Sequence, residues 1–354
     1  RKMPIRKKQH RSIGGFSELL GNAREVLGSP MLDRNMYPEA IERNNRAEEE
    51  RAAYSAPHTS YAELHCHSNY SFQEGASDTH ELLKRAQELG YRALAITDHD
   101  NLCGAMEFAQ AARDAGIKAI TGVEVTLMGG HHLTLLAEDA EGYKNISRLT
   151  THAHIDAEER NNPELDPALL SEHAEGAICL SGCRDGEIST LVLRGEIERA
   201  TQLARQYRDW FGPENFFLEL QQNLVKDDTL RNRLMANIAA EIGVGLVATN
   251  NAHYHDVSRS RLNDALVAIQ HNKSMEESHR ERRPNDQFYL KHPDEMAALF
   301  ADYPEAIANT VRIAERCDLE LTTDAIYEFP EYDVPDGHTQ ATWLRQLCEE
   351  AAIR

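Results

Sequence analysis

The sequence predicts an α/β barrel over residues 60–255, with helices covering a curved sheet. Three observations favour this fold class: short apolar runs alternate with stretches of helical periodicity, the runs have the length of buried strands, and potential metal ligands follow most of them. Strands that alternate with helices indicate a parallel sheet. Because about seven such strands fall within roughly 200 residues, we expect the sheet to close into a barrel.

The individual elements are predicted from the spacing of apolar residues. Continuous or alternating apolar runs predict strands at 61–67, 92–97, 118–127, 132–137, 176–181, 216–220 and 243–249. Apolar residues three or four positions apart predict helices at 81–89, 105–115, 197–211 and 228–242. The strand signals fade after residue 255, and a further helix is predicted at 303–316. A mainly helical segment should therefore follow the barrel.

Three regions differ along the chain. Residues 1–58 open with six basic and no acidic side chains among the first eleven, then become charge-dense, so we expect a partly disordered N-terminal extension. Residues 59–282 hold the predicted barrel domain. Residues 283–354 are predicted to be a connector and the truncated start of a further domain. Because the chain begins with Arg1 and stops in a helical pattern, we expect a fragment of a longer protein.

The composition is that of a globular protein from a reducing compartment. Hydrophobic residues make up 41% of the chain and charged residues 27%, which is ample for a core. Six cysteines are too few for a disulfide framework in 354 residues. No stretch approaches the ~20 apolar residues of a membrane span. We expect a cytoplasmic protein that does not contact a membrane.

The net charge of −20 argues against simple electrostatic binding of a nucleic acid, because binding to the phosphate backbone depends on Lys and Arg side chains that neutralise phosphates. Two interpretations of the acidity stay open. The carboxylates can form a solvated surface that keeps the protein soluble. Alternatively, some of them serve metal ions, and any DNA contacts lie outside this chain.

The segment YAELHCHSNYS contains the first candidate metal ligands. Residues two apart on a strand share one face, so His65 and His67 should project together and Cys66 to the opposite side. Two imidazoles on one face of a strand commonly bind one metal ion together. Alone, this pair is a weak signal in a chain with 17 histidines.

Five further candidates strengthen the signal because they share a place in the pattern. Three come shortly after a predicted strand, one lies near the end of a strand and one opens a strand; they are, in this order, His99, Cys183 and His253, then Glu124, then His132. The C-terminal ends of parallel strands are where α/β barrels build their active sites. His132 is the exception to this placement, and only one of His131 and His132 can line the site.

The types of side chain constrain the metal. Imidazoles, carboxylates and one thiolate suit Zn²⁺ best, with Mn²⁺ or Fe²⁺ as alternatives. Seven ligands exceed what one tetrahedral ion takes, so two or three ions are implied. Clustered divalent ions activate water and clamp a phosphate, which indicates metal-assisted hydrolysis of a phosphoester.

Six motifs, in order, resemble the PHP (polymerase and histidinol phosphatase) domain that opens the bacterial C-family DNA polymerases. These polymerases include the replicative polymerase III alpha subunit and its error-prone paralogue. The motifs are HCHSNYSFQEGAS (65–77), LAITDHDNLCGAMEF (94–108), TGVEV (121–125), HHLTLLAEDAEGYKNISRL (131–149), CLSGCRDGEI (179–188) and VATNNAHYH (247–255). Residues 283–319 resemble the passage leading into that family's polymerase domain. The resemblance covers the chain from about Tyr61 onward.

The resemblance implies a distorted seven-stranded barrel with a nine-position site for up to three ions. Carried over position by position, the ligands are His65, His67, Glu74, His99, Glu124, His132, Cys183, Asn251 and His253. Metal-competent members have Asp where this chain has Glu74 and Asn251, and the neutral Asn251 adds no charge to the site. Asp98 is expected to orient an imidazole through a hydrogen bond rather than to bind metal.

The resemblance further implies a fragment of an error-prone DNA-directed DNA polymerase, active in DNA replication, translesion synthesis and repair. Its polymerase residues, their Mg²⁺ and most DNA contacts would lie beyond this chain. The PHP domain would be either a scaffold or a 3′–5′ exonuclease, and Glu74 and Asn251 favour a scaffold that keeps Zn²⁺ or Mn²⁺. The alternatives are a free-standing phosphoesterase of the histidinol-phosphatase type and a module that recruits a clamp or accessory mutagenesis proteins.

Overall fold

The computed structural model describes residues 58–157, 162–324 and 333–353. The predicted N-terminal extension lies outside these residues except for His58, so its expected partial disorder stays a prediction. Helix α13 (Gln340–Ile353) follows the gap at 325–332 and is described by itself. No described helix combines the length and the apolar character that a membrane span requires.

A curled sheet forms the centre of the protein. In the part of the chain that the structure describes, it has six strands, which lie side by side in sequence order. They are β1 (Ala93–Ile96), β2 (Lys118–Leu127), β3 (His131–Ala137), β4 (Ala177–Leu180), β5 (Phe216–Gln221) and β6 (Gly245–Thr249). Each falls in a region that the apolar pattern predicts as a strand. Six of the seven predicted strands are thus confirmed.

The seventh predicted strand, residues 61–67, is not continuous. It forms isolated parallel bridges, from Glu63 to β1 and from Cys66 to Ala252, just after β6. The amide of Ala95 in β1 donates to the carbonyl of Glu63 at 2.9 Å. The segment therefore lies between the two edge strands of the sheet, but a seven-stranded barrel is not confirmed.

The expectation that all strands of the sheet are parallel is wrong for β3. Strand pairs β1–β2, β4–β5 and β5–β6 are parallel, whereas β3 runs antiparallel to both β2 and β4. The cause is the short turn between β2 and β3, where Gly129 and Gly130 take φ values of +94° and +77°. Glycine adopts this backbone conformation without steric cost, so the chain reverses directly instead of crossing over through a helix.

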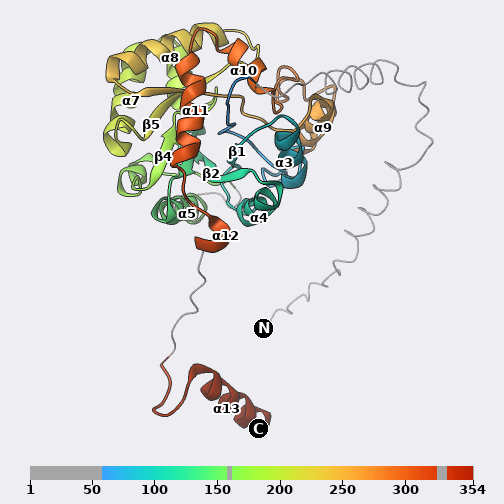
Figure 1. Ribbon diagram of the computed structural model, residues 1–354, viewed down its shortest axis with the longest axis vertical. Helices are drawn as coiled ribbons and strands as arrows, with labels where there is room; N and C mark the ends of the chain where they lie inside the picture. Colours follow the sequence, from blue (N-terminus) through green and yellow to red (C-terminus); the bar gives the residue numbers. More distant parts are fainter. Residues whose placement is uncertain (1–57, 158–161, 325–332, 354) are drawn as a thin grey trace, which may run out of the picture. The chain divides into compact units, whose positions relative to one another are not determined.

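Helices surround the sheet (Figure 1), and the individual helices predicted at 81–89, 105–115, 197–211, 228–242 and 303–316 are confirmed, whereas the mainly helical segment after the barrel stays a prediction. Before β6 lie α3 (Thr79–Glu88), α4 (Ala105–Ala115), α5 (Ala140–Ile155), α6 (Glu187–Leu193), α7 (Ile197–Phe211) and α8 (Asp228–Ile242). After β6 come α9 (Ser260–Gln270), α10 (Pro293–Leu299), α11 (Pro304–Arg316) and α12 (Leu321–Asp324). Local sequence fixes their ends: Asp78 forms a capping box with Glu81 at the start of α3, and Gly116 ends α4 in the left-handed conformation.

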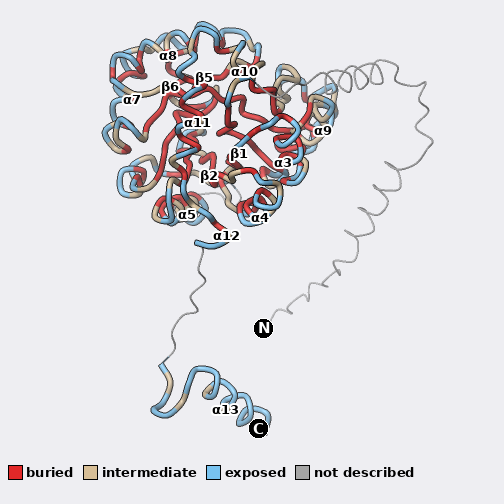
Figure 2. The backbone as a smooth tube through the Cα atoms, in the orientation of Figure 1, coloured by how far each residue is buried: buried red, intermediate tan, exposed pale blue. Residues whose placement is uncertain are grey.

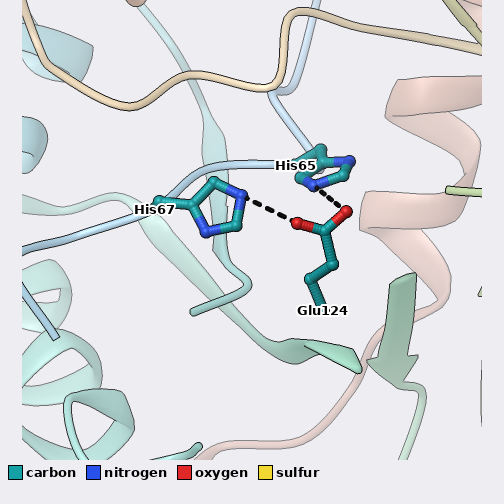
Figure 3. Close-up of side chains that lie close together, drawn as sticks. All are labelled: His65, His67 and Glu124. Carbon is teal, nitrogen blue, oxygen red and sulfur yellow. Dashed lines mark ion pairs between the residues drawn. The ribbon is translucent and has the colours of Figure 1, made fainter. Parts of the chain in front are cut away.

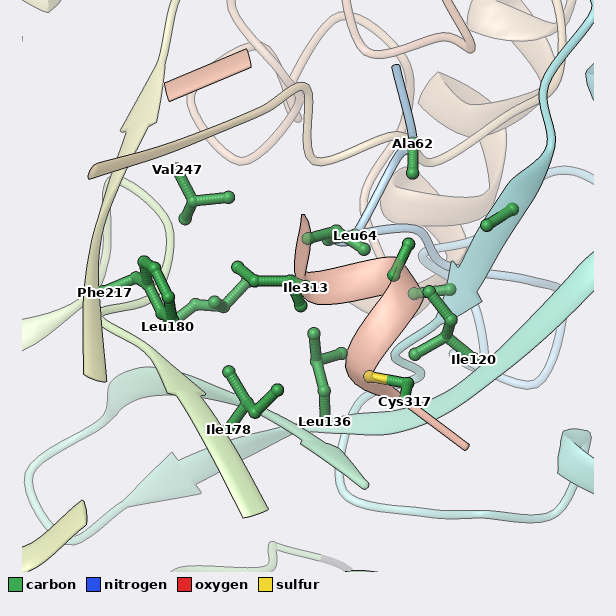
Figure 4. Close-up of a cluster of buried hydrophobic side chains, with 13 residues drawn as sticks. Ala62, Leu64, Ile120, Leu136, Ile178, Leu180, Phe217, Val247, Ile313 and Cys317 are labelled. Atoms are coloured by element: carbon green, nitrogen blue, oxygen red, sulfur yellow. The ribbon is translucent and has the colours of Figure 1, made fainter. Parts of the chain in front are cut away.

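Helix α11 packs its apolar face against the inner residues of the curled sheet. Ile313 is fully buried in a cluster to which all six strands and residues 61–67 contribute (Figure 4). The labelled members of this cluster are Ala62, Leu64, Ile120, Leu136, Ile178, Leu180, Phe217, Val247, Ile313 and Cys317. Figure 2 shows buried residues along the sheet and a mixture of buried and exposed residues on the surrounding helices.

Polar contacts hold α11 in this position. The side chain of Asn309 donates to the carbonyl of Leu246 in β6 at 2.7 Å, and the amide of Ala62 donates to the Thr310 hydroxyl at 3.2 Å. The apolar cluster therefore occupies one end of the sheet's interior. The opposite ends of the same strands are free to carry polar side chains.

A buried lysine anchors the segment that leads into α10. The Lys291 ammonium donates to the carbonyl of Gln287 at 2.7 Å and lies 3.9 Å from the centre of the Tyr289 ring. The carboxylate of Glu295 is also 3.9 Å away, and the hydroxyl of Tyr91 donates to the Lys291 carbonyl. Burial lowers the pKa of Lys291 to about 8, because the charged ammonium loses its hydration.

Replacing Ile313 with alanine should lower the free energy of unfolding by about 2–5 kcal/mol, because it leaves a cavity in a fully buried cluster. Urea denaturation at neutral pH measures the change. Arg312 lies on the exposed side of the same helix, so Arg312→Ala should stay within about 0.5 kcal/mol of wild type. Equal losses in both variants would contradict the assigned role of α11.

Between pH 7.5 and 9.5, the free energy of unfolding of the wild-type protein should rise by about 2 kcal/mol more than that of the Lys291→Met variant. A lysine with a pKa of about 8 when folded and about 10.4 when unfolded binds fewer protons in the folded state within this interval. Stability must then rise with pH until the unfolded pKa is passed. Urea denaturation of both proteins at the two pH values measures the difference, and parallel pH profiles would contradict it.

Candidate metal centre

The strands deliver potential metal ligands to the end of the sheet opposite α11. His99 follows β1, Glu124 lies in β2, Cys183 follows β4, and His253 follows β6. His132 opens β3, and this position is explained by the reversal of that strand. Because β3 is antiparallel, its first residues lie beside the last residues of the parallel strands.

The centre of the cluster is the Glu124 carboxylate. Its two oxygens lie 3.3 Å from Nε2 of His65 and 3.3 Å from Nε2 of His67 (Figure 3). Nε2 of His99 is 3.1 Å from one oxygen, and Nδ1 of His132 is 3.6 Å from the other. Four imidazoles therefore face one carboxylate that is only 1% exposed.

The facing atoms in this cluster do not satisfy one another. Both carboxylate oxygens of Glu124, and Nε2 of His65 and His67, are buried and make no hydrogen bond within the described part of the chain. Buried polar groups are nearly always paired, because leaving one unpaired costs about 1–3 kcal/mol. A cation placed between these four converging atoms would satisfy all of them.

A hydrogen bond to Glu219 fixes the tautomer of the His65 imidazole. Its Nδ1 lies 2.7 Å from a carboxylate oxygen of Glu219, which is fully buried in β5. A carboxylate accepts, so Nδ1 carries the proton and the lone pair of Nε2 faces the site. Glu219 also accepts hydrogen bonds from Gln221 and Thr249, which fix its orientation.

Asp98 is linked to the His67 imidazole through the hydroxyl group of Ser71. Asp98 accepts hydrogen bonds from the amide and hydroxyl groups of both Ser68 and Ser71. The Ser71 hydroxyl lies 3.0 Å from Nδ1 of His67 and accepts from the amide of His99. Because this hydroxyl donates its proton to Asp98, it receives the proton of His67, whose Nε2 is then free for a metal.

The buried carboxylates of the cluster favour positive charge beside them, and the pKa values of the neighbouring groups show this. Burial disfavours protonation of His65, but the carboxylates of Glu219 and Glu124 outweigh it and raise its pKa. Burial likewise disfavours ionised Glu124, yet the neighbouring imidazoles hold the pKa of its carboxyl well below the usual range. The pKa of His132 rises to about 9 despite burial, chiefly because Glu124 is close. A divalent ion would supply the same charge without protons.

The remaining predicted residues lie in the same pocket. Glu74 is 3.1 Å from Nε2 of His99, and the Cys183 sulfur is 3.5 Å from Nδ1 of His132. Asn251 and His253 contact each other. A cavity of about 570 Å³ is lined by seven of the predicted residues, namely Glu74, His99, Glu124, His132, Cys183, Asn251 and His253. His65 and His67 are fully buried and do not line this cavity, but the His67 ring stacks on those of His99 and His253.

These donors fit divalent ions at specific places. Three groups offer ligand atoms that lie within 4.8 Å of one another: His65–His67–Glu124, His99–Glu124–His132, and His132–Cys183–Asp185. Nitrogen, carboxylate and thiolate donors in this mixture suit Zn²⁺, and the nitrogen and oxygen donors alone also suit Mn²⁺.

Sequence reasoning missed Asp185 and Arg283, which line this pocket, and Glu219, which contacts His65. Glu219 is signalled by a carboxylate inside the apolar strand FFLELQ, and Asp185 by its place two residues after Cys183. Arg283, whose guanidinium contacts His253, lies in a polar connector that carries no such signal. Its place in the site follows from the path of the chain after β6.

Comparison with known proteins gives the family context. Residues 63–223 match the family described as the PHP domain. The chain contains a PHP domain. This match confirms the resemblance seen in the six motifs, while the predicted domain limits of 59 and 282 stay predictions.

The curated relatives of this PHP-containing chain are bacterial DNA polymerases. It is 41% identical over 310 residues to the error-prone DNA polymerase of Symbiobacterium thermophilum, covering 83% of this chain and 28% of that protein. It is 37% identical to the DNA polymerase III subunit alpha of Treponema pallidum, covering 81% and 26%. The error-prone DNA polymerase of Mycobacterium tuberculosis is 38% identical, covering 85% and 29%. The chain thus spans less than a third of these relatives' length.

One solved structure similar to this chain is that of a putative metal-dependent phosphoesterase from Bifidobacterium adolescentis. The TM-score is 0.40 at 14% sequence identity, covering 56% of this chain and 89% of that protein.

Substituting Glu219 with glutamine should weaken Zn²⁺ binding by about 10- to 100-fold, because the His65 imidazole loses the charged acceptor that fixes its tautomer. Competition with a fluorescent zinc chelator measures the affinity. Glu172 is exposed and remote in the fold, so Glu172→Gln is the matched control and should bind as wild type does. Unchanged affinity in Glu219→Gln would contradict this role.

Proposed function

We propose that this PHP domain holds divalent ions, Zn²⁺ or Mn²⁺, with ligands among the nine predicted positions. One observation carries the proposal: the buried Glu124 carboxylate has two unpaired oxygens facing the unpaired Nε2 atoms of His65 and His67. Asp98 and Glu219 act on the ligands through hydrogen bonds. When bound, such ions supply Lewis acidity and lower the pKa of bound water.

We further propose that the full-length protein is an error-prone DNA-directed DNA polymerase. The support is the identity of 36–41% to DNA polymerases over four fifths of this chain or more. Polymerisation, its Mg²⁺ and the main DNA contacts would belong to regions beyond residue 354. The same relationship supports roles in DNA replication, translesion synthesis and repair in the cytoplasm. A clamp and accessory mutagenesis proteins are proposed partners.

Within that enzyme we propose a structural role for the metal centre. The candidate ligands come from five strands or strand ends, from the loop that carries Glu74, and from residues 61–67, which we take as the irregular seventh strand of a barrel spanning 59–282. Ions shared by these ligands would hold the polar end of the sheet together, as α11 holds the apolar end. Asn251 supports this role over hydrolysis, because a neutral amide binds a catalytic ion weakly.

A 3′–5′ exonuclease is the second candidate, and the 570 Å³ cavity beside His99 and Cys183 favours it. Arg184 and Arg283 line this cavity and could contact a phosphate. The free-standing phosphoesterase of the histidinol-phosphatase type would use the same cavity. It has less support, because the similarity to polymerases extends well beyond the residues that match the PHP family.

Removing the metal with a chelator should lower the melting temperature of the purified protein by several degrees, since a ligand that binds only the folded state stabilises it. Adding back Zn²⁺ or Mn²⁺ should restore it, whereas His65→Ala should melt at the lower temperature with or without metal. Differential scanning calorimetry measures these values.

The same preparations distinguish the alternatives. Incubation with single-stranded DNA should give no metal-dependent cleavage; robust cleavage that His65→Ala abolishes would establish the exonuclease instead. Rapid phosphate release from small phosphomonoesters would favour the free-standing phosphoesterase. A melting temperature that chelation leaves unchanged would refute the structural role.

A further inference from the structure

His253 differs from the other imidazoles because both of its ring nitrogens are engaged by protein groups. Nδ1 lies 2.8 Å from a guanidinium nitrogen of Arg283, and Nε2 lies 2.9 Å from the side-chain oxygen of Asn251. A guanidinium can only donate, so Nδ1 accepts and Nε2 carries the proton that it gives to Asn251. In this tautomer neither nitrogen has a lone pair available for a metal ion.

The path of the backbone places Arg283 firmly beside His253. The amide of His253 donates to the carbonyl of Phe288 at 2.8 Å, and Tyr254 forms a parallel bridge with Tyr289. The guanidinium carbon of Arg283 lies 4.8 Å from the centre of the Phe288 ring. The segment carrying Arg283 is thus hydrogen-bonded to the strand end that carries His253.

The charge of Arg283 is directed toward the acidic side of the pocket. Burial disfavours ionised Glu74, yet the pKa of its carboxyl lies below the usual value, chiefly because of the His99 imidazole and to a smaller extent because of the Arg283 guanidinium. Asn251, the other neighbour of His253, is neutral. The pocket wall around His253 therefore already contains a cation and lacks the second carboxylate that a divalent ion there would need.

The residues of this wall contact the convergent donor groups but are not members of them: the His253 ring stacks on the His67 ring with 4.2 Å between centroids, and Glu74 lies 3.1 Å from Nε2 of His99. Among the His, Cys, Asp and Glu side chains of the described residues, His253 and Glu74 belong to none of the three groups of converging ligand atoms. Two of these groups, those with His99 and with Cys183, share His132. Its Nδ1 is the nitrogen nearest both Glu124 and Cys183, at 3.6 and 3.5 Å, and one lone pair serves one ion. The donors thus provide for two ions.

We infer that the centre holds two divalent ions and that the Arg283 guanidinium takes the place of a third beside His253. One ion is held by His65, His67 and Glu124. The second is held by Glu124, His99 and His132, with Cys183 adjacent. Arg283 instead supplies a fixed positive charge at the wall of the cavity. The inference rests on the proposed metal binding and narrows its ligand set by excluding His253.

Elemental analysis of the purified chain, saturated with Zn²⁺ and then desalted, tests this inference. The wild type should retain about two equivalents. His253→Gln should also retain about two, whereas His132→Gln should lose at least one. A loss in His253→Gln equal to that in His132→Gln would overturn the exclusion of His253, and three equivalents in the wild type would do the same.

A second set of variants tests Arg283 itself. The double variant Arg283→Met with Asn251→Asp frees His253 and adds a carboxylate beside it, so it should retain about three equivalents. Asn251→Asp alone should stay at two, because Arg283 then pairs with the new carboxylate. Arg282→Met combined with Asn251→Asp removes a neighbouring guanidinium, which pairs with Asp264, and is the matched control that should also stay at two.

The outcomes separate the inference from the function on which it rests. Three equivalents in Asn251→Asp alone, or two in the folded double variant, would overturn the role of Arg283. A wild type without bound metal would instead refute the proposed metal centre, and the two-ion assignment with it. Circular dichroism verifies folding, and if the double variant does not fold, His253→Gln decides the question.

Discussion

The architecture of the site depends on one buried carboxylate, that of Glu124. Glu124 lies where four imidazoles from three segments of the chain meet, and its oxygens make no hydrogen bond in the described residues. An ionised carboxylate in such a place is costly unless a cation is near. The surrounding network, from Glu219 to His65 and from Asp98 through Ser71 to His67, keeps the Nε2 lone pairs aimed at the same point.

Much of this site could be predicted from the sequence because strand ends are easy to recognise. Apolar runs locate the strands, and the polar residues that follow them, such as His99 and Cys183, must then gather at one edge. His132 did not fit this rule, because the pattern of apolar residues does not show strand direction. The reversal comes from Gly129 and Gly130, a turn signal that sits between two regions both correctly assigned as strands.

Other features could not be predicted, because they depend on where distant segments pass. Residues 61–67 have the alternating pattern of a strand, yet they pair only at isolated positions as they pass from one edge of the sheet to the other. Arg283 reaches the site only because the chain after β6 returns along residues 252–254. Nothing in the local sequence around Arg283 marks it as a neighbour of His253, and periodicity carries no information about such long-range contacts.

The position of α11 has a consequence for how the molecule is made. The hydrogen bond between Ala62 and Thr310 joins residues 248 positions apart, and Ile313 completes a cluster that began with Ala62 and Leu64. During synthesis the early strands therefore leave the ribosome long before the helix that covers their apolar side chains. Contacts of such high sequence separation form slowly and leave hydrophobic surface exposed meanwhile. The nascent domain is thus an expected client of chaperones until the polypeptide has extended past α11.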